Sequence, residues 1–457
     1  MDLVKLMTDD ILTSLSSAFD ELALPAHAKL YLACSGGRDS LALAYACFLL
    51  YRQGKIIRLP TILHVHHGWQ AANDAWMQLV HRWAIEHGFD CQILRITLAK
   101  NSETHARDAR YQAFGLVMNQ GDVLMLAHHA NDQAETVLMR LVSGAGLQGL
   151  SGMKVWQAKT VHTDEAAKTI TLWRPWLKIL RDKISQFANA HALPYVDDIT
   201  NTDPAYARGR IRQDILPHLL ALNPKAVENI VRSAGLLSMA STMVDQQVGT
   251  LLASLDHPAN QMPYQQVLGI KDFLNLSKSE QALVLHRWLQ ADEALPPSHQ
   301  LTQQVIEMIC RQDNDHSSQL VWQAEQAAYV MCCYDDCLYR YRADIWALFG
   351  TSGHTKPSSQ GWILSDDGRC QLILMAKIDD IQKITKTDTI NIGKHRYKGK
   401  KLAQKLRIPF WLRDSLWKIN HQGHPYLIAP MMVWDLSSGQ RLDSFAPIGR
   451  MVYNAPD

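Results

Sequence analysis

The segment AKLYLACSGGRDS, residues 28–40, joins a short apolar run to a polar loop rich in glycine and serine. Leu30–Cys34 predicts a buried strand, and the apolar residues of 41–50 predict a buried helix directly after the loop. The loop therefore lies where a strand turns into a helix. Such a turn brings together unpaired backbone N–H groups and the positive end of the helix dipole, which suits a phosphate.

The side chains of this loop have the chemistry that a phosphate site needs. Glycine lets the backbone approach an anion closely, serine hydroxyls can donate hydrogen bonds, and Asp39 can hold a cation such as Mg²⁺ against bound phosphates. The motifs GxxxxGK[ST] and GxGxxG are both absent here, so the loop is not of the commonest nucleotide-binding types. The predicted phosphate-binding residues are Ser35, Gly36, Gly37, Arg38, Asp39 and Ser40.

Composition indicates a soluble, cytoplasmic protein with more than one domain. The chain has 457 residues, of which 47% are hydrophobic and 20% charged, enough for two or three folded cores. The formal net charge is +2, so a nucleic-acid surface would have to come from local clustering. No apolar run approaches the ~18 residues of a membrane helix, and no signal-peptide pattern is present, so we expect no membrane partner.

The first 220 residues have the pattern of one α/β unit. Strand patterns at 61–66, 91–98 and 123–128 follow the first strand, and helical patterns at 73–87, 105–118 and 131–142 separate them. This alternation predicts a mostly parallel sheet covered by helices on both faces. Ligands of such sheets bind at the carboxyl ends of the strands. Polar motifs fall at three of these ends, at 35–40, 66–68 and 128–129, so we expect the functional site there.

Acidic residues open the helix at 131–142. Asp132 and Glu135 lie three residues apart and share one face of the first helical turn. The helix dipole favours acids at that position, so capping alone would explain them. Beside a bound triphosphate they would also hold Mg²⁺ or an incoming ammonium group. We predict that Asp39, Asp132 and Glu135 are catalytic and that Asp39 and Asp132 bind the metal.

Arginines occur at two further places that suit contacts with phosphates or nucleotides. Arg107 and Arg110 are three residues apart and face the same way, although such a pair is also common on a solvated helix face. A second group follows the acidic turn at 197–203 and consists of Arg208, Arg210 and Arg212.

The order of these motifs is specific. SGGRDS, HVHHG, ARDARY, AHHANDQAET, RPWL and DDITNTDPAYARGRIR follow one another between residues 35 and 212. Together they resemble the tRNA(Ile)-lysidine synthetases, which are ATP pyrophosphatases (PP-loop enzymes) that cleave ATP between the α and β phosphates. The chain departs from the family pattern at Asn131, where aspartate is usual, and at Gly209, where asparagine is usual.

This resemblance implies an α/β parallel-sheet adenine-nucleotide (PP-loop) domain at 1–220, a helical tRNA-binding domain at 221–349 and a small α+β tRNA-binding domain at 362–457. It implies ligation of L-lysine to C2 of the wobble cytidine of tRNA(Ile) with a CAU anticodon, with ATP and Mg²⁺. A homodimer is compatible with the sequence. The arginines expected to bind lysine's carboxylate or the phosphates, without a division between these roles, are Arg107, Arg110, Arg208 and Arg212. His128 is also expected to bind substrate.

A basic run lies in the C-terminal part of the chain. Residues 394–407 include seven lysines or arginines and no acid, and aromatic residues lie in and just after this run. Basic runs are usually solvated faces, but interleaved aromatic residues are expected where a protein grips an RNA backbone and stacks on bases. The segment also resembles the C-terminal tRNA-binding domain of the larger lysidine synthetases. We predict RNA contacts from Lys400, Lys401, Lys405, Trp411 and Arg413.

Three other functions fit parts of the sequence. A tRNA thiolase of the same class would need a reactive cysteine pair or cluster ligands, but the eight cysteines include no CxxC pair and are best explained as structural. A small-molecule amidotransferase or synthetase should carry a glutaminase domain. A non-catalytic RNA-binding protein would have a degenerate nucleotide site, whereas SGGRDS and DQAET are intact, and it would fail to cleave ATP.

Overall fold

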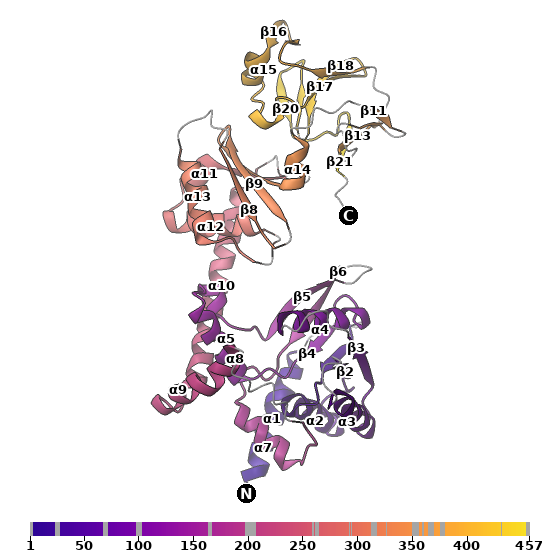
Figure 1. The fold of residues 1–457 in the computed structure, drawn as a ribbon, viewed down its shortest axis with the longest axis vertical. Coiled ribbons are helices and arrows are strands. Elements are labelled where there is room, and N and C mark those ends of the chain that lie inside the picture. The colour runs from indigo at the N-terminus through magenta and orange to yellow at the C-terminus, as the bar shows by residue number, and fades with distance from the viewer. Residues whose placement is uncertain are drawn as a thin grey trace. The chain divides into compact units, whose positions relative to one another are not determined.

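The computed structural model describes residues 3–22, 28–66, 72–96, 103–162, 167–196, 207–257, 260, 265–291, 293, 295–311, 318–325, 327–349, 356–358, 361–363, 370–374, 380–430 and 432–453. These form two compact units, Met1–Met243 and Val244–Asp457, which we describe separately (Figure 1). The predicted acidic turn at 197–203 and the motif residues 67–68 lie outside the described residues.

A six-stranded sheet with the order β3-β2-β1-β4-β6-β5 is the centre of the first unit. Every neighbouring pair is parallel except β5 and β6, which form an antiparallel hairpin at one edge. The mostly parallel sheet is therefore confirmed, whereas the hairpin was not expected. The strands are β1 (Leu30–Ala33), β2 (Thr61–His66), β3 (Cys91–Arg95), β4 (Val123–Met125), β5 (Trp156–His162) and β6 (Ala167–Trp173).

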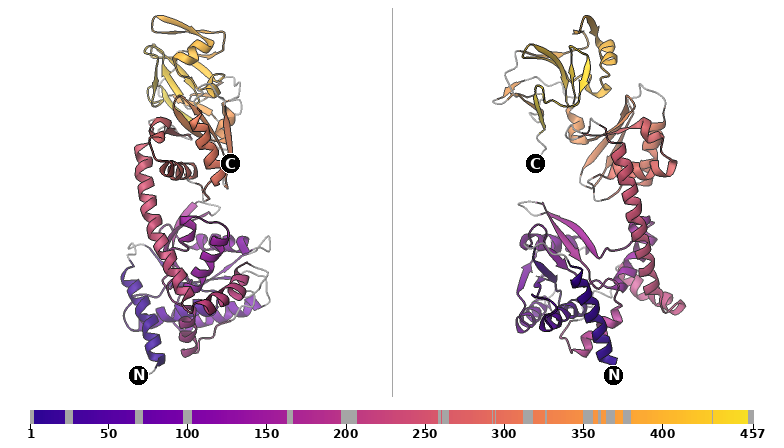
Figure 2. Two further views of the ribbon diagram at one scale, coloured as in Figure 1. Left: turned by 90° about the vertical axis from the view of Figure 1, so that its left-hand side faces the viewer. Right: turned by 180° about the vertical axis from the view of Figure 1, so that it is seen from behind.

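Helices cover both faces of this sheet (Figure 2). Side chains alternate along β1, so Leu30 and Leu32 pack towards one face and Tyr31 towards the other. The first face is covered by α1 (Leu3–Asp20), α2 (Arg38–Arg52), α3 (Ala72–Glu86) and α7 (Arg181–Ala190), and the second by α4 (Glu103–Val117).

The topology places a ligand crevice at the end of β1. The neighbours of β1 are β2 on one side and β4 on the other, so the chain leaves β1 and β4 towards opposite halves of the sheet. Open α/β sheets bind ligands at such a switch point, outside the carboxyl ends of the strands. The elements that follow β1 and β4 are the phosphate-loop candidate with α2 and the helix α5 (Ala130–Val142).

A small apolar cluster attaches a group of helices to α5. Ala130 and Ala134 of α5 pack with Ile211, Leu216 and Val227. This cluster fixes the position of the arginines at 208–212 relative to α5. The cluster residues outside α5 lie on the π-helix η2 (Ile211–Ile215), α9 (Leu216–Leu222) and α10 (Ala226–Ser254). Two short helices complete this part of the chain: α6 (Leu147–Leu150), which follows α5, and α8 (Ala207–Arg210), which precedes η2.

The second unit begins with a helical layer against a four-stranded antiparallel sheet of order β7-β10-β9-β8. The helices α12 (Lys278–Gln290) and α13 (His299–Cys310) agree with the helical character expected at 221–349, but that expectation missed the sheet. In β10 even Arg340 is buried, so the alternation of its residues does not separate a core face from a solvent face. The remaining elements are β7 (Gln265–Gly269), α11 (Ile270–Leu274), β8 (Gln319–Gln323), β9 (Ala328–Tyr334), β10 (Cys337–Arg342) and α14 (Ala343–Leu348).

The C-terminal part is α+β, as expected, and shares a core with the four-stranded sheet. Tyr339 and Tyr341 of β10 belong to the same apolar cluster as Trp417 and Trp434. The boundaries of the three expected domains remain a prediction. The elements are β11 (Lys356–Ser358), β12 (Gly361–Ile363), β13 (Cys370–Leu374), β14 (Asp380–Ile384), β15 (Thr389–Ile392), β16 (His395–Lys398), α15 (Gly399–Lys405), η4 (Phe410–Leu412), β17 (Leu416–His421), β18 (His424–Ala429), β19 (Met432–Asp435), β20 (Gln440–Leu442) and β21 (Gly449–Tyr453). In the described parts of both units, no helix has the length and apolar character to cross a membrane.

Candidate active site

The loop between β1 and α2 is braced by its own serines. Ser35 Oγ accepts the backbone N–H of Gly37 at 3.3 Å, and Ser40 Oγ donates to the Gly37 carbonyl at 2.9 Å. Gly36 has a φ of +87°, and a Cβ atom there would lie 3.0 Å from Val80, so the position favours glycine. Within the described structure no side chain caps the N-terminus of α2, which leaves its first N–H groups available to an anion.

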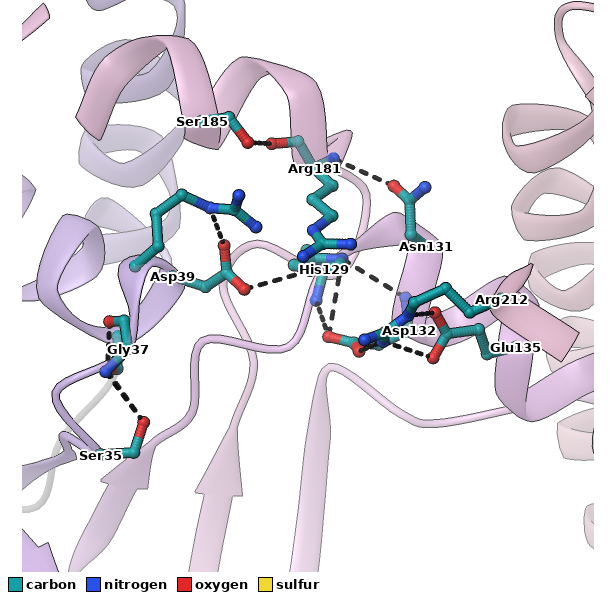
Figure 3. A network of polar contacts seen from close by, with 12 residues as sticks. Ser35, Gly37, Asp39, His129, Asn131, Asp132, Glu135, Arg181, Ser185 and Arg212 are labelled. Atoms are coloured by element: carbon teal, nitrogen blue, oxygen red, sulfur yellow. Dashed lines mark hydrogen bonds and ion pairs between the residues drawn. The ribbon is translucent and has the colours of Figure 1, made fainter. Parts of the chain in front are cut away.

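Asp39, in the first turn of α2, is the acid of this loop (Figure 3). Its carboxylate accepts a hydrogen bond from Nε of Arg38 at 3.0 Å and lies 3.5 Å from Nε2 of His129. Burial opposes ionisation, but the hydrogen bond and charge of His129, together with Arg38, outweigh it and lower the pKa of Asp39 to about 2. With 30% of its side chain exposed, the carboxylate is ionised at neutral pH and accessible to a cation.

His129 connects the phosphate loop to α5. As the N-cap of that helix, its Nδ1 accepts the backbone N–H of Asp132 at 3.3 Å, while Asp132 Oδ2 accepts the backbone N–H of His129 at 3.1 Å. Because Nδ1 is an acceptor, the neutral ring carries its proton on Nε2, which faces Asp39. The ring is buried, so its position between the two aspartates is fixed.

The two acids of α5 are paired with arginines (Figure 3). Glu135 is 1% exposed, and its oxygens accept hydrogen bonds from Nε of Arg208 and Nε of Arg212, each at 2.7 Å. Arg208 also donates to Oδ1 of Asp132 at 3.0 Å. Burial raises the pKa of Asp132, but the charges of His129 and Arg208 outweigh it and lower that pKa. These ion pairs join α5 to α8 and η2.

This pairing restricts the roles that we predicted for the acids. Oδ2 of Asp132 caps α5 and Oδ1 receives Arg208, so a metal would have to replace the arginine. The carboxylate of Glu135 is fully buried between Arg208 and Arg212, so in this arrangement it is not open to an ammonium group. Asp39 is the predicted acid that remains accessible.

His128, which we predicted to bind substrate, accepts a hydrogen bond from Arg174. Nε of Arg174 donates to Nδ1 of His128 at 3.2 Å. Burial lowers the pKa of His128 to about 4; Asp132 opposes this shift, whereas the charges of Arg174, Arg208 and Arg107 add to it. The ring is therefore neutral at pH 7, and its function is that of a fixed polar group.

The remaining predicted residues of the first unit have separate surroundings. Arg107 and Arg110 are exposed on α4, and the Arg107 guanidinium lies 6.0 Å from the ring centre of Tyr111. Oδ1 of Asn131 accepts the backbone N–H of Arg181 at the start of α7. The asparagine that departs from the family pattern at position 131 therefore connects α5 with α7.

The basic run of the second unit has one residue that does not fit its predicted role. Lys400, Lys401 and Lys405 are exposed on or beside α15, whereas Trp411 is 7% exposed and packs at 5.2 Å between ring centres on Tyr339. Stacking of Trp411 on an exposed base is therefore wrong, because the apolar ring is more stable in the core. Arg413 is half-buried and donates to the Ile408 carbonyl at 3.2 Å.

Two residues at the site were not among our predictions. His129 was passed over in favour of His128, although the pair HH before an acidic helix start indicates an N-cap. Arg174 is 1% exposed and donates to His128, to the Lys154 carbonyl and to Gln157. The motif RPWL contained it, but a buried arginine cannot be distinguished from an exposed one by its neighbours in sequence.

A parallel sheet with a glycine- and serine-rich loop at its switch point defines a nucleotide-binding protein of the PP-loop class, and a family model described as a PP-loop domain matches residues 7–219. A second model, the TilS substrate binding domain, matches residues 268–339. The tRNA(Ile)-lysidine synthase of Psychrobacter sp. is 41% identical over 71% of this chain and 66% of its own length. That of Pseudomonas fluorescens is 31% identical over 74% of each chain.

The chain belongs to the tRNA(Ile)-lysidine synthase family. The tRNA(Ile)-lysidine synthase of Pseudomonas putida is 35% identical over 58% of this chain. The chain spans 66% and 61% of the lengths of the Psychrobacter and Pseudomonas putida relatives.

Proposed function

We propose that this protein is an ATP-dependent ligase that attaches L-lysine to C2 of the wobble cytidine (position 34) of tRNA(Ile) with a CAU anticodon. The product, lysidine, changes codon reading from AUG to AUA. The observation that carries the proposal is the link from the Ser35–Ser40 loop through Asp39 and His129 to Asp132. Membership of the family supports the same reaction.

In the first step the C2 oxygen of the cytidine attacks the α phosphate of ATP, and pyrophosphate leaves. Ser35 and Gly36, with the N-terminus of α2, have backbone N–H groups suited to the phosphates of ATP, whereas the Gly37 N–H would first have to leave Ser35 Oγ. The pKa of Asp39, lowered to about 2, suits a carboxylate that faces a cation. Mg²⁺ fits this carboxylate, because the ion is commonly held by one or two carboxylates plus substrate phosphates, whose charge it neutralises.

In the second step the ε-amine of lysine forms a bond to C2, and AMP leaves with the former C2 oxygen. The amine loses a proton in this step, and a carboxylate or an imidazole within reach of the nitrogen would accept it; Asp39, with its pKa lowered to about 2, suits the cation and not this proton. For Asp132 or Glu135 to receive the lysine ammonium, the guanidinium groups of Arg208 and Arg212 would have to move away. In that rearrangement these arginines would be candidates to bind the lysine carboxylate.

The RNA would be bound by both units. Lys400, Lys401 and Lys405 have the exposure and charge for phosphate contacts, and Arg413 is a further candidate. In the first unit, Arg107 and Arg110 are exposed near the sheet edge. A tRNA substrate is found in the cytoplasm, where we therefore expect the protein to act.

The test is release of pyrophosphate from ATP by the purified full-length chain, with and without CAU-anticodon tRNA(Ile) and L-lysine. We expect release that depends on the tRNA, and its loss in Asp39→Asn, whose amide cannot balance a cation. Lys55→Ala, at an exposed position in the connection that precedes β2, at the amino ends of the strands, is the surface control. If no pyrophosphate is released in the presence of the tRNA, the proposal is overturned and a non-catalytic RNA-binding protein is favoured.

A further inference from the structure

Cationic side chains gather around Tyr111 between α4 and the β5–β6 hairpin. The Nζ atom of Lys159, on β5, lies 4.6 Å from the centre of the Tyr111 ring, and the Arg107 guanidinium carbon lies 6.0 Å from it. Arg107 is exposed, Lys159 is half-buried, and Tyr111, on the inner face of α4, is buried in the core. We call Arg107, Lys159 and Arg174 the α4–β5 rim.

The backbone and core hold this rim in place. Arg174 is buried and donates to the Lys154 carbonyl at 2.8 Å and to Oε1 of Gln157 at 3.1 Å, both in or next to β5. Arg140, from α5, donates to the carbonyl groups of Gly149 and Gly152 at 2.9 Å each. The acceptors of these hydrogen bonds are neutral groups. The hydrogen bonds therefore hold Arg140 and Arg174 in place but do not neutralise their positive charges.

The cations of the rim and the neighbouring Arg140 of α5 act on one another. Burial lowers the pKa of Lys159, and the charge of Arg107 lowers it further, with Asp108 in opposition. Burial and the charge of Arg107 also lower the pKa of Arg140, and they do so for Arg174 against the influence of Tyr111. Groups held together in this way gain from a bound anion, which removes part of their repulsion.

We propose that the α4–β5 rim binds a backbone phosphate of the RNA substrate next to the nucleotide that enters the active site. This inference rests on the proposed function and adds Lys159 to the substrate-binding residues. The hydrogen bond from Arg174 to His128 makes the rim continuous with the active site. The phosphates of ATP belong to the loop after β1, whereas β5 is three strands away in the sheet, or roughly 14 Å at the usual strand spacing.

The geometry also favours an RNA phosphate over a small carboxylate. The guanidinium of Arg107 and the ammonium of Lys159 come from two different elements and lie around one aromatic ring, with Arg107 open to solvent. A phosphate diester passing along the surface can contact both cations while its base points towards the crevice at β1 and β4. A cation placed over an aromatic ring loses less freedom on binding, because the ring already orders its stem.

The test uses the full chain and a fluorescently labelled anticodon stem-loop of tRNA(Ile), without ATP or lysine, and measures affinity over a series of salt concentrations. In Lys159→Met the apolar stem remains over Tyr111 but the charge is lost. We expect affinity to fall about three- to tenfold and the slope of log affinity against log salt to fall by about 0.7, the value of one single-strand phosphate contact. Lys159→Arg keeps the charge and should retain both values.

Lys55→Ala removes an exposed charge from the connection that precedes β2, at the amino ends of the strands, and should leave the affinity unchanged. Unfolding in urea checks that Lys159→Met is folded. Wild-type affinity and salt slope in Lys159→Met would overturn the inference, and a rise in the KM for lysine alone would assign the rim to the lysine carboxylate instead. If the unaltered protein does not bind the stem-loop, the proposed function fails together with this inference.

Discussion

Nε2 of His129 lies 3.5 Å from Oδ2 of Asp39, and the same ring accepts the backbone N–H of Asp132 through Nδ1 at 3.3 Å. One buried side chain therefore connects the loop after β1 with the helix after β4. These are the two elements at the switch point of the sheet, so the geometry of the phosphate loop depends on a residue about ninety positions further along the chain. The contact with Asp39 and the cap of α5 can be separated by substitution.

His129→Asn keeps an oxygen that can accept the Asp132 N–H, but it removes the group that faces Asp39. We expect nearly unchanged stability and a loss of at least tenfold in the rate of pyrophosphate release. His129→Ala loses the cap as well and should lower the free energy of unfolding by about 1 kcal/mol. Urea unfolding and pyrophosphate release measure the two effects. Full activity in His129→Asn would mean that Asp39 needs no support from the imidazole.

Glu135→Gln removes the buried charge between Arg208 and Arg212. Two arginines then lose a partner that is 1% exposed, although both keep some access to water. We expect the free energy of unfolding to fall by about 2 to 3 kcal/mol, below the usual cost of breaking a fully buried pair. Urea unfolding is the measurement, and Glu86→Gln, at an exposed position, should change the value by less than about 0.5 kcal/mol. An equally small change in Glu135→Gln would show that the ion pairs contribute little.

The stability of the first unit should depend on pH through His128. Its pKa is about 4 in the folded protein, below the value of ~6.5 expected for the unfolded chain. The unfolded chain therefore binds the proton first, so the stabilisation is complete above pH ~6.5 and is lost as the pH falls towards 4.

His128→Asn retains an acceptor for Arg174 but does not titrate. Between pH 7 and pH 5 the unaltered protein should lose about 1 to 2 kcal/mol more stability than this variant, since the ring is only partly shielded from water. Urea unfolding at the two pH values gives the difference. Parallel losses in both proteins would mean that His128 titrates normally.

Substitutions in the basic run should lower the affinity for tRNA but not the stability, whereas substitution of Trp411 should lower the stability. Changing Lys400, Lys401 and Lys405 together to alanine removes exposed charges, so stability should change by less than ~1 kcal/mol while affinity for tRNA falls at least tenfold. Trp411→Ala instead opens a cavity beside Tyr339 and should cost about 3 to 5 kcal/mol of stability. Filter binding with tRNA and urea unfolding separate the two. Normal stability in Trp411→Ala would show that this side chain does not pack in the core.

The sequence predicted those features that depend on local pattern. Leu30–Cys34 and the glycines after it were sufficient for the strand, the loop and the start of α2, because burial and backbone freedom leave a clear signature there. Asp132 and Glu135 were correctly placed on one face of α5. Their spacing could not reveal that Arg208 and Arg212 neutralise Glu135, since that pairing depends on how α8 and η2 pack against α5.

The predictions failed where burial decides a role. Trp411 follows a run of exposed lysines, so its surroundings in sequence indicate a surface, yet the fold brings it into the core with Tyr339 and Trp346. Arg174 shows the reverse case, a charged residue in a buried position, where it donates hydrogen bonds to His128 and to acceptors in or next to β5. Neither position has a periodic pattern from which burial could be inferred.

The most direct test of the central claim is mass spectrometry of the nucleosides from CAU-anticodon tRNA(Ile) incubated with the purified protein, ATP and isotopically labelled L-lysine. The account predicts that one cytidine per tRNA is converted to a lysine adduct, with AMP and pyrophosphate formed in equal amounts, and that Asp39→Asn forms none. An unmodified wobble cytidine in the presence of all three substrates, with a protein that is folded and binds the tRNA, would contradict it.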